Sequence, residues 1–154
     1  MLGPPTESPA LHAGLVVAAV AFLAVAGTLP ARPAPDATGV ADTVDAVAAG
    51  PAPAGASHDH GADAVRLRPH GIAMRNDAGT ARATFAFGPV VPVDDGELRA
   101  VLREGAPQAV FSTRAAFREA VEAALAREPS WIASDEITVT GVDWDGYRVT
   151  LVGA

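Results

Sequence analysis

The sequence predicts an α+β fold: an N-terminal transmembrane helix, then a small domain whose antiparallel sheet of about four strands packs on two helices. Three observations predict it. Residues 11–29 form an uncharged apolar segment. Apolar and polar residues alternate over 64–88 and again over 136–152, as in half-buried strands. Between these stretches, 96–104 and 113–127 carry apolar residues at helical spacing.

The first element is the segment 11–29, LHAGLVVAAVAFLAVAGTL, which contains no Asp, Glu, Lys or Arg. At about 1.5 Å per residue it makes a helix of about 28 Å, close to the thickness of the hydrocarbon core of a bilayer. Its apolar residues lie all around the helix, which disfavours a buried core helix. A cleaved signal peptide is the alternative, because residues 24–26, Ala-Val-Ala, precede Gly27. No Lys or Arg precedes Leu11, which favours an uncleaved anchor.

The apolar segment separates a short lead, residues 1–10, from the rest of the chain. Residues 30–62 are rich in Pro, Ala and Gly and predict a linker. The α+β domain is expected to occupy 63–154, which is enough chain for a single modest core.

One short helix is expected within this linker, over residues 37–49. Valines recur there at positions i, i+4 and i+7. Asp36 or Thr38 could cap it, and Gly50 followed by proline ends it. The remainder, 50–61, has few bulky residues and predicts a mobile connection.

The domain begins with alternating patterns that predict strands over 64–68, 70–75 and 80–88. Residues 76–79, Asn-Asp-Ala-Gly, provide a turn between the second and the third. Pro92 then excludes the next piece of chain from a central position in a sheet.

Two amphipathic helices follow. The acidic pair at 94–95 is expected to cap a helix over 96–104. Ser112 or Thr113 is expected to cap a longer helix over 113–127, which carries a continuous apolar stripe.

The chain ends in a predicted hairpin of strands 136–143 and 147–152. Asp145-Gly146 is the dipeptide that two-residue hairpin turns prefer.

Composition restricts the function. The 154 residues include 11 basic and 18 acidic side chains, for a net charge of −7, and every Lys/Arg position is an arginine. This pattern is typical of a halophile. An acidic chain without an apparent basic stripe is a poor candidate for binding nucleic acid or anionic lipid. The absence of cysteine excludes disulfides, thiolate metal sites and a cysteine nucleophile.

The first candidate for metal binding is the pair His58 and His60, because a His-x-His pair on an extended segment directs both rings to one side. Asp63 or His70 could add a ligand. The tract lies in the predicted linker, with no visible outer shell to orient the rings, so exposed polar residues are the simpler interpretation.

No recognised catalytic motif is present, so we expect a non-enzymatic protein without a cofactor. Residues 94–97, Asp-Asp-Gly-Glu, could form a carboxylate pair, but helix capping explains them better. Asp143 and Asp145 flank a turn and are explained by it. Trp131 and Trp144 are expected to pack in the domain, with an interface or partner role as the alternative for Trp131.

Three stretches carry a resemblance to a known family: VADTVDAVAAG, AVRLRPHGIAMRNDAGTARATFAFGPVVPV and VTLVG. Together they resemble an uncharacterised haloarchaeal family of small single-span membrane proteins, a domain of unknown function. The most specific part is 76–90. No activity or catalytic residue comes with this resemblance.

The layout is also similar to that of archaeal pilin-like proteins, which have a hydrophobic helix, a helical continuation and a β-rich head. Two features depart from it. No basic residue stands before the hydrophobic segment, and Pro30, Pro33 and Pro35 interrupt the helix that a pilin continues. An accessory membrane protein therefore fits better than a filament subunit.

We therefore expect a non-enzymatic single-span membrane protein that presents a small interaction or assembly domain at the cell envelope. Its partners would be the lipid bilayer, through 11–29, and other envelope or pilus-type proteins, with no nucleic acid. The alternative is a secreted or anchored ligand- or metal-binding domain that uses His58 and His60. Arg32 mildly favours a cytoplasmic domain by charge, whereas the pilin-like layout favours an extracellular one, which we prefer.

Overall fold

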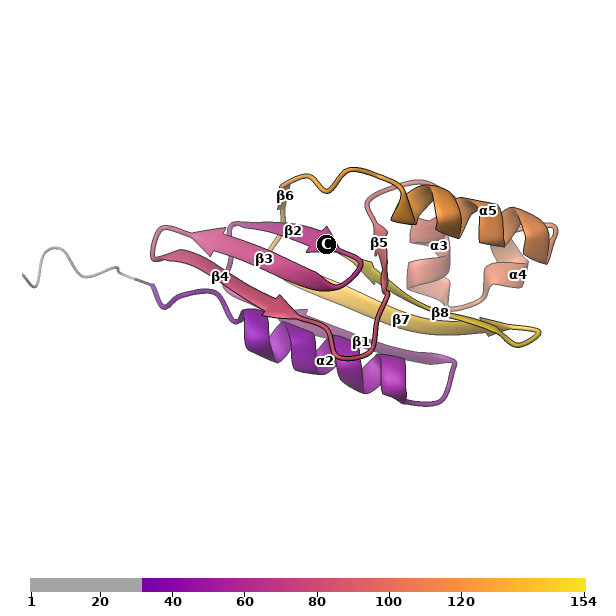
Figure 1. Cartoon of the computed structure of the whole chain (residues 1–154), viewed down its shortest axis with the longest axis horizontal. Helices are drawn as coiled ribbons and strands as arrows, with labels where there is room; N and C mark the ends of the chain where they lie inside the picture. Colours follow the sequence, from indigo (N-terminus) through magenta and orange to yellow (C-terminus); the bar gives the residue numbers. More distant parts are fainter. Residues whose placement is uncertain (1–31) are drawn as a thin grey trace, which may run out of the picture. The chain divides into compact units, whose positions relative to one another are not determined.

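The computed structural model describes residues 32–154. Four helices and eight strands follow one another in this part of the chain (Figure 1). They are α2 (Ala37–Ala49), β1 (Ala54–Asp59), β2 (Ala64–Arg68), β3 (Gly71–Asn76), β4 (Gly79–Thr84), β5 (Val91–Val93), α3 (Glu97–Glu104), α4 (Pro107–Val110), α5 (Arg114–Leu125), β6 (Ile132–Ala133), β7 (Glu136–Trp144) and β8 (Tyr147–Gly153).

The strands form two four-stranded sheets. Sheet 1 has the order β1-β7-β8-β5, and sheet 2 has the order β4-β3-β2-β6. All neighbours are antiparallel except β5 and β8, which are parallel. The α+β class is confirmed, but the expectation of one sheet on two helices is wrong. The first predicted strands and the last hairpin belong to different sheets.

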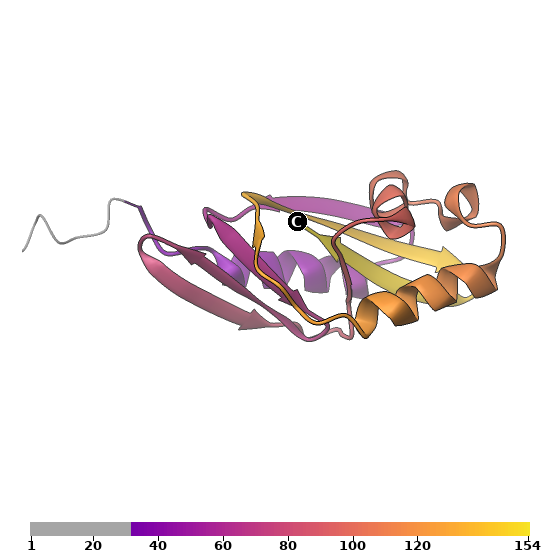
Figure 2. The same cartoon turned by 90° about the horizontal axis from the view of Figure 1, so that it is seen from above.

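Both faces of sheet 1 are covered. Ile137 and Val139 of β7 point into a first core, which sheet 1 shares with α2 and the inner face of sheet 2. Val142 of β7 and Leu151 of β8 point into a second core, which is completed by α3 and α5. Figures 1 and 2 show α2 running beside both sheets, with α3, α4 and α5 gathered at the end of the domain opposite the β3–β4 turn.

The helix predicted over 37–49 is confirmed as α2, and Asp36 is its cap. The Asp36 carboxylate accepts a hydrogen bond from the Gly39 N–H at 2.9 Å. Because α2 buries Val40, Val44 and Val47 in the first core, it is an integral part of the domain.

The connection predicted over 50–61 contains a strand instead. Residues Ala54–Asp59 form β1 and pair along their whole length with β7, from Ala54 opposite Gly141 to Asp59 opposite Glu136. Small residues are tolerated there because β1 is an edge strand whose partly buried alanines pack against the first core. The compact unit therefore begins at Arg32, not at 63.

The helices predicted in the second half are confirmed as α3 and α5, with one difference in capping. Thr113 caps α5 by accepting a hydrogen bond from the Ala116 N–H at 3.2 Å. The N-cap of α3 is Gly96, without a side-chain cap, so the acidic pair at 94–95 does not cap this helix.

The predicted final hairpin is confirmed, and so is the exclusion of Pro92 from a central strand. β7 and β8 meet at Asp145 and Gly146, which both have positive φ (49° and 80°), as the predicted turn requires. Pro92 lies in β5 at the edge of sheet 1, where a missing N–H is tolerated.

Within residues 32–154, none of the helices has the length and apolar character needed to cross a bilayer. The predicted transmembrane segment, 11–29, lies outside the described residues.

Candidate functional site

The outer face of sheet 2 is the most distinctive surface of the domain. In β2, Val65 and Leu67 are buried in the first core. Successive side chains of a strand point to opposite faces, so the residues between and after these two point outward. We call this surface the arginine face, and it comprises Arg66 and Arg68 of β2, Arg75 of β3 and Arg82 of β4.

Strand register brings these four side chains together. Arg66 pairs with Ala73, which in turn pairs with Arg82, so the three residues form one row across the sheet. Residues directly opposite one another share a face. Arg75 follows Ala73 by two positions and therefore lies on this face as well.

A trough runs along the middle of the arginine face. Its floor is Gly71 and Ala73 of β3, which lack bulky side chains, and its walls come from the neighbouring strands. A Cβ at position 71 would lie 2.6 Å from the Ala83 carbonyl oxygen, so the approach of β4 requires glycine there.

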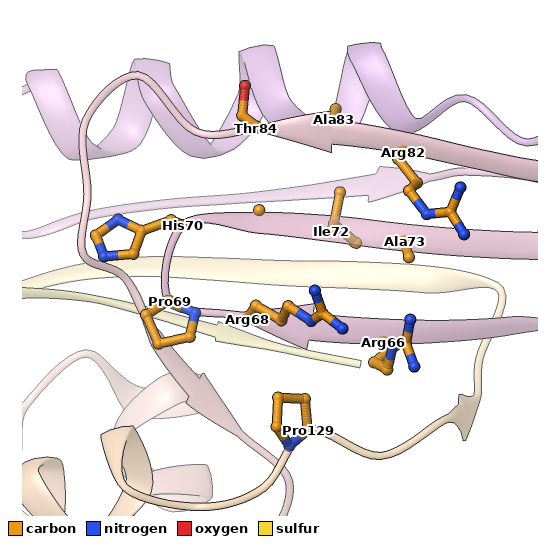
Figure 3. A pocket seen from close by; sticks show the side chains of 11 residues that line it. Arg66, Arg68, Pro69, His70, Ile72, Ala73, Arg82, Ala83, Thr84 and Pro129 are labelled. Carbon is orange, nitrogen blue, oxygen red and sulfur yellow. The ribbon is translucent and has the colours of Figure 1, made fainter.

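The trough opens into a hollow of about 600 Å³, within the range of small-molecule sites. Figure 3 shows Arg82 extending from β4 toward β3. The polar and ring-bearing side chains around this hollow are Arg66, Arg68, Pro69, His70, Arg82, Thr84 and Pro129.

The arginine face is not neutralised within the part of the chain that the structure describes. Arg32 pairs with Asp63 at 2.7 Å, and Arg127 pairs with the 94–95 carboxylates. None of the four arginines of the face forms such a pair with a described residue. An otherwise acidic chain thus concentrates positive charge at one place, where guanidinium groups can bind phosphate or carboxylate.

Trp131 contacts two of these arginines. The Arg66 guanidinium carbon lies 4.8 Å from the indole ring centroid, and that of Arg75 lies 4.4 Å from it. Such cation–π contacts are worth about 0.5–1 kcal/mol each at exposed sites. The Nε of Arg66 is buried and has no hydrogen-bond partner among the described residues. Trp131 therefore packs within a basic surface, beside the unsatisfied Nε donor of Arg66.

The predicted metal candidates are part of the framework of the domain. His58 lies in β1, with Nδ1 at 3.2 Å from the Thr43 hydroxyl and Nε2 at 3.2 Å from the Asp36 carboxylate. Asp36 also accepts the Gly39 N–H, which is the main cause that lowers its pKa, and His58 lowers it further. Both ring nitrogens of His58 therefore join β1 to α2.

His60 lies in the interior, only 2 % exposed. Its Nδ1 accepts a hydrogen bond from the Ala62 N–H at 3.1 Å, and its Nε2 has no partner among residues 32–154. Because Nδ1 accepts, the neutral ring carries its proton on Nε2. Burial lowers the pKa of His60, although Asp135 and Asp59 oppose this effect.

We expect the free energy of unfolding to fall as the pH drops below about 6.5, the ordinary pKa of histidine. Between that value and the lower folded pKa of His60, the unfolded chain binds more protons than the folded chain. His60→Asn keeps an acceptor for Ala62 and removes the titration, so denaturant unfolding between pH 7.5 and 5.5 should depend less on pH. His70→Asn serves as the control, because it removes an exposed histidine and retains the buried ring of His60. Equal slopes of unfolding free energy against pH in all three proteins would contradict the assignment of the pH dependence to His60.

The acidic candidates have structural partners. Asp94 and Asp95 lie 3.6 and 3.2 Å from the Arg127 guanidinium. Asp143 accepts the Gly146 N–H at 3.1 Å in the β7–β8 turn. No cluster of three His, Asp or Glu side chains within 32–154 is arranged to hold a metal ion.

Sequence reasoning missed the arginine face because it weighed net charge and not strand register. Arg66 and Arg68 alternate with apolar residues on a predicted strand, which is a usable signal. Arg75 has an odd residue number and Arg82 an even one, so alternation along the sequence does not place them on one face. Only the pairing of β3 with both neighbouring strands shows that they share it.

The comparisons with known proteins give one match. Residues 3–142 match a family of unknown function, DUF7283. No curated protein and no solved structure shows significant similarity to the chain. This agrees with the expectation of an uncharacterised family, and the length of the match shows that the chain belongs to DUF7283.

Proposed function

We propose that the chain is a non-enzymatic single-span membrane protein of the cell envelope, anchored through 11–29, whose α+β domain is an interaction module for an anionic partner. The observation that carries the proposal is the arginine face. Four arginines without carboxylate partners among the described residues lie on one surface of a chain with net charge −7. Leaving guanidinium groups unpaired favours an external anion as their partner.

The anchor is supported by the sequence alone. Residues 11–29 are uncharged and have the length of a membrane span. The lysine-free, acidic composition supports a haloarchaeal origin, and the order of hydrophobic segment, helix and β-rich domain supports a pilin-like layout with the domain outside the cell. The three prolines after the span favour an accessory protein over a filament subunit.

One experiment with two readouts on the full-length chain tests this proposal. Membranes are washed with carbonate, and the mass of the retained chain is determined; we expect retention with 1–29 present. The detergent-solubilised chain is then applied to a sulfonate cation exchanger at neutral pH. Despite a pI near 4.9, we expect the arginine face to retain it and Arg82→Glu to abolish retention, while the exposed Arg103→Glu, on α3, keeps it.

Three outcomes would overturn parts of the proposal. Release by carbonate, or a mass that begins near Gly27, would remove the anchor. Protection of the domain from protease added to intact cells would place it in the cytoplasm. Equal behaviour of Arg82→Glu and Arg103→Glu on the exchanger would remove the arginine face as the binding surface.

A further inference from the structure

We infer that the trough of the arginine face binds the phosphate groups of anionic lipid headgroups in the membrane that anchors the chain. This inference deepens the proposed function and rests on it, because it takes the anionic partner to be the lipid beside the span. The chemistry is recognition of a phosphate oxyanion by guanidinium groups, and the source to which we commit is lipid.

The side chains of the trough suit a phosphate group. Arg66 and Arg82 stand on either side of Ala73, and Arg68 follows along the same wall. Planar guanidinium groups on both sides of a small-residue floor can donate to one phosphate from two directions. The Nε of Arg66 is buried and has no hydrogen-bond partner among the described residues.

The site also has an apolar part. Pro69, Ile72 and Pro129 line the hollow next to the charged groups (Figure 3). Trp131 adds an amphipathic ring that Arg66 and Arg75 hold in place. Aromatic rings beside arginines are typical of surfaces that meet the headgroup level of a membrane.

The first residues of the compact unit, Arg32 and Pro33, contact residues near the Arg75 end of the arginine face. Arg32 pairs with Asp63 at 2.7 Å, and the Asp63 N–H donates to the Arg75 carbonyl at 2.9 Å. Asn76, the next residue of β3, donates to the Pro33 carbonyl at 2.9 Å. The domain thus starts beside the Arg75 end of the arginine face.

The connection between the predicted span and the domain is short. Only residues 30–32 follow the predicted span up to this starting point, and fully extended they reach about 10 Å. Lipid phosphate is the anion that such a short tether keeps at high local concentration. The net charge of the chain matters less than the local cluster, because salt screens charges more than about 8–10 Å away at 0.1–0.15 M and over a shorter distance at higher salt.

The test uses the full-length chain in nanodiscs of phosphatidylcholine, with or without phosphatidylglycerol. Trp144→Phe leaves Trp131 as the single indole, and a headgroup-attached quencher reports its distance from the lipid phosphates. We expect strong quenching in anionic discs and weak quenching in neutral discs. Arg82→Glu should reduce the anionic-lipid effect by about tenfold, whereas Arg103→Glu makes the same charge change away from the trough and should leave it unaltered.

The other outcomes overturn the inference. Equal quenching in both kinds of disc, or no difference between Arg82→Glu and Arg103→Glu, would exclude headgroup binding. A response of Trp131 to free glycerol phosphate, an acidic peptide or an oligonucleotide, without a response to anionic lipid, would assign the trough to a soluble partner. Flotation with neutral vesicles measures the anchor separately, so a chain that floats without lipid-dependent quenching contradicts this inference alone.

Discussion

We expect Phe117→Ala to lower the free energy of unfolding by about 3–5 kcal/mol, the range for deleting a buried aromatic ring. Phe117 is fully buried in the second core. Its ring centroid lies 5.5 Å from that of Phe111, 6.0 Å from Trp144 and 5.9 Å from Tyr147. Alanine would leave a cavity between α5 and the β7–β8 hairpin. Because both elements are closely packed, neither can move freely to fill it.

Equilibrium denaturant unfolding of the full-length chain in detergent measures this change, followed by near-ultraviolet circular dichroism of the two tryptophans. Phe117→Leu keeps most of the volume and serves as the control, with a smaller loss. A loss below about 1 kcal/mol for Phe117→Ala would mean that the second core contributes little to stability, contrary to its packing.

The second large effect concerns the core beneath the arginine face. Met74 is fully buried, with 0 % of its surface exposed to solvent. It lies in β3 between the outward-facing Ala73 and Arg75. We expect Met74→Ala to cost about 2–5 kcal/mol of unfolding free energy because the first core loses volume between sheet 2 and α2.

Met74→Leu conserves volume and should cost less than about 1.5 kcal/mol. The pair also separates stability from binding. Neither substitution changes a charge of the arginine face, so under conditions where both variants are folded, each should be retained on the sulfonate resin as the parent chain is. Loss of retention in folded Met74→Leu would show that the position of β3 in the core, and not only the charge, sets the affinity.

These cores explain why the arginine face can be presented at all. The inner face of sheet 2 packs on the first core, and the guanidinium groups of its outer face have no carboxylate partner among the described residues. Gly71 and Ala73 of β3 lack bulky side chains and form the floor of the trough. On the other side of the first core, His58 of β1 hydrogen-bonds to Asp36, the N-cap of α2, and so fixes α2 against β1. The surface therefore rests on a framework in which Asp36 and His58 have hydrogen-bond partners.

Local patterns alone determined several elements. Three valines at helical spacing and a capping aspartate were sufficient for α2, and Thr113 with an apolar stripe was sufficient for α5. Asp145-Gly146 was sufficient for the β7–β8 turn. In each case the signal and the interaction it reports lie within a few residues of each other, so nothing distant is needed to interpret it.

Tertiary structure alone decided the rest, because the deciding contacts join residues far apart in the chain. Residues 54–59 have the composition of a linker and become β1 only because β7, some eighty residues later, supplies a complete set of hydrogen-bond partners. The helix α2 packs against both sheets in the first core, which joins residues from 37 to 152. The arginine face depends on the register of β3 with its neighbours, since a shift of one residue in that pairing would turn Arg66 and Arg82 to different faces.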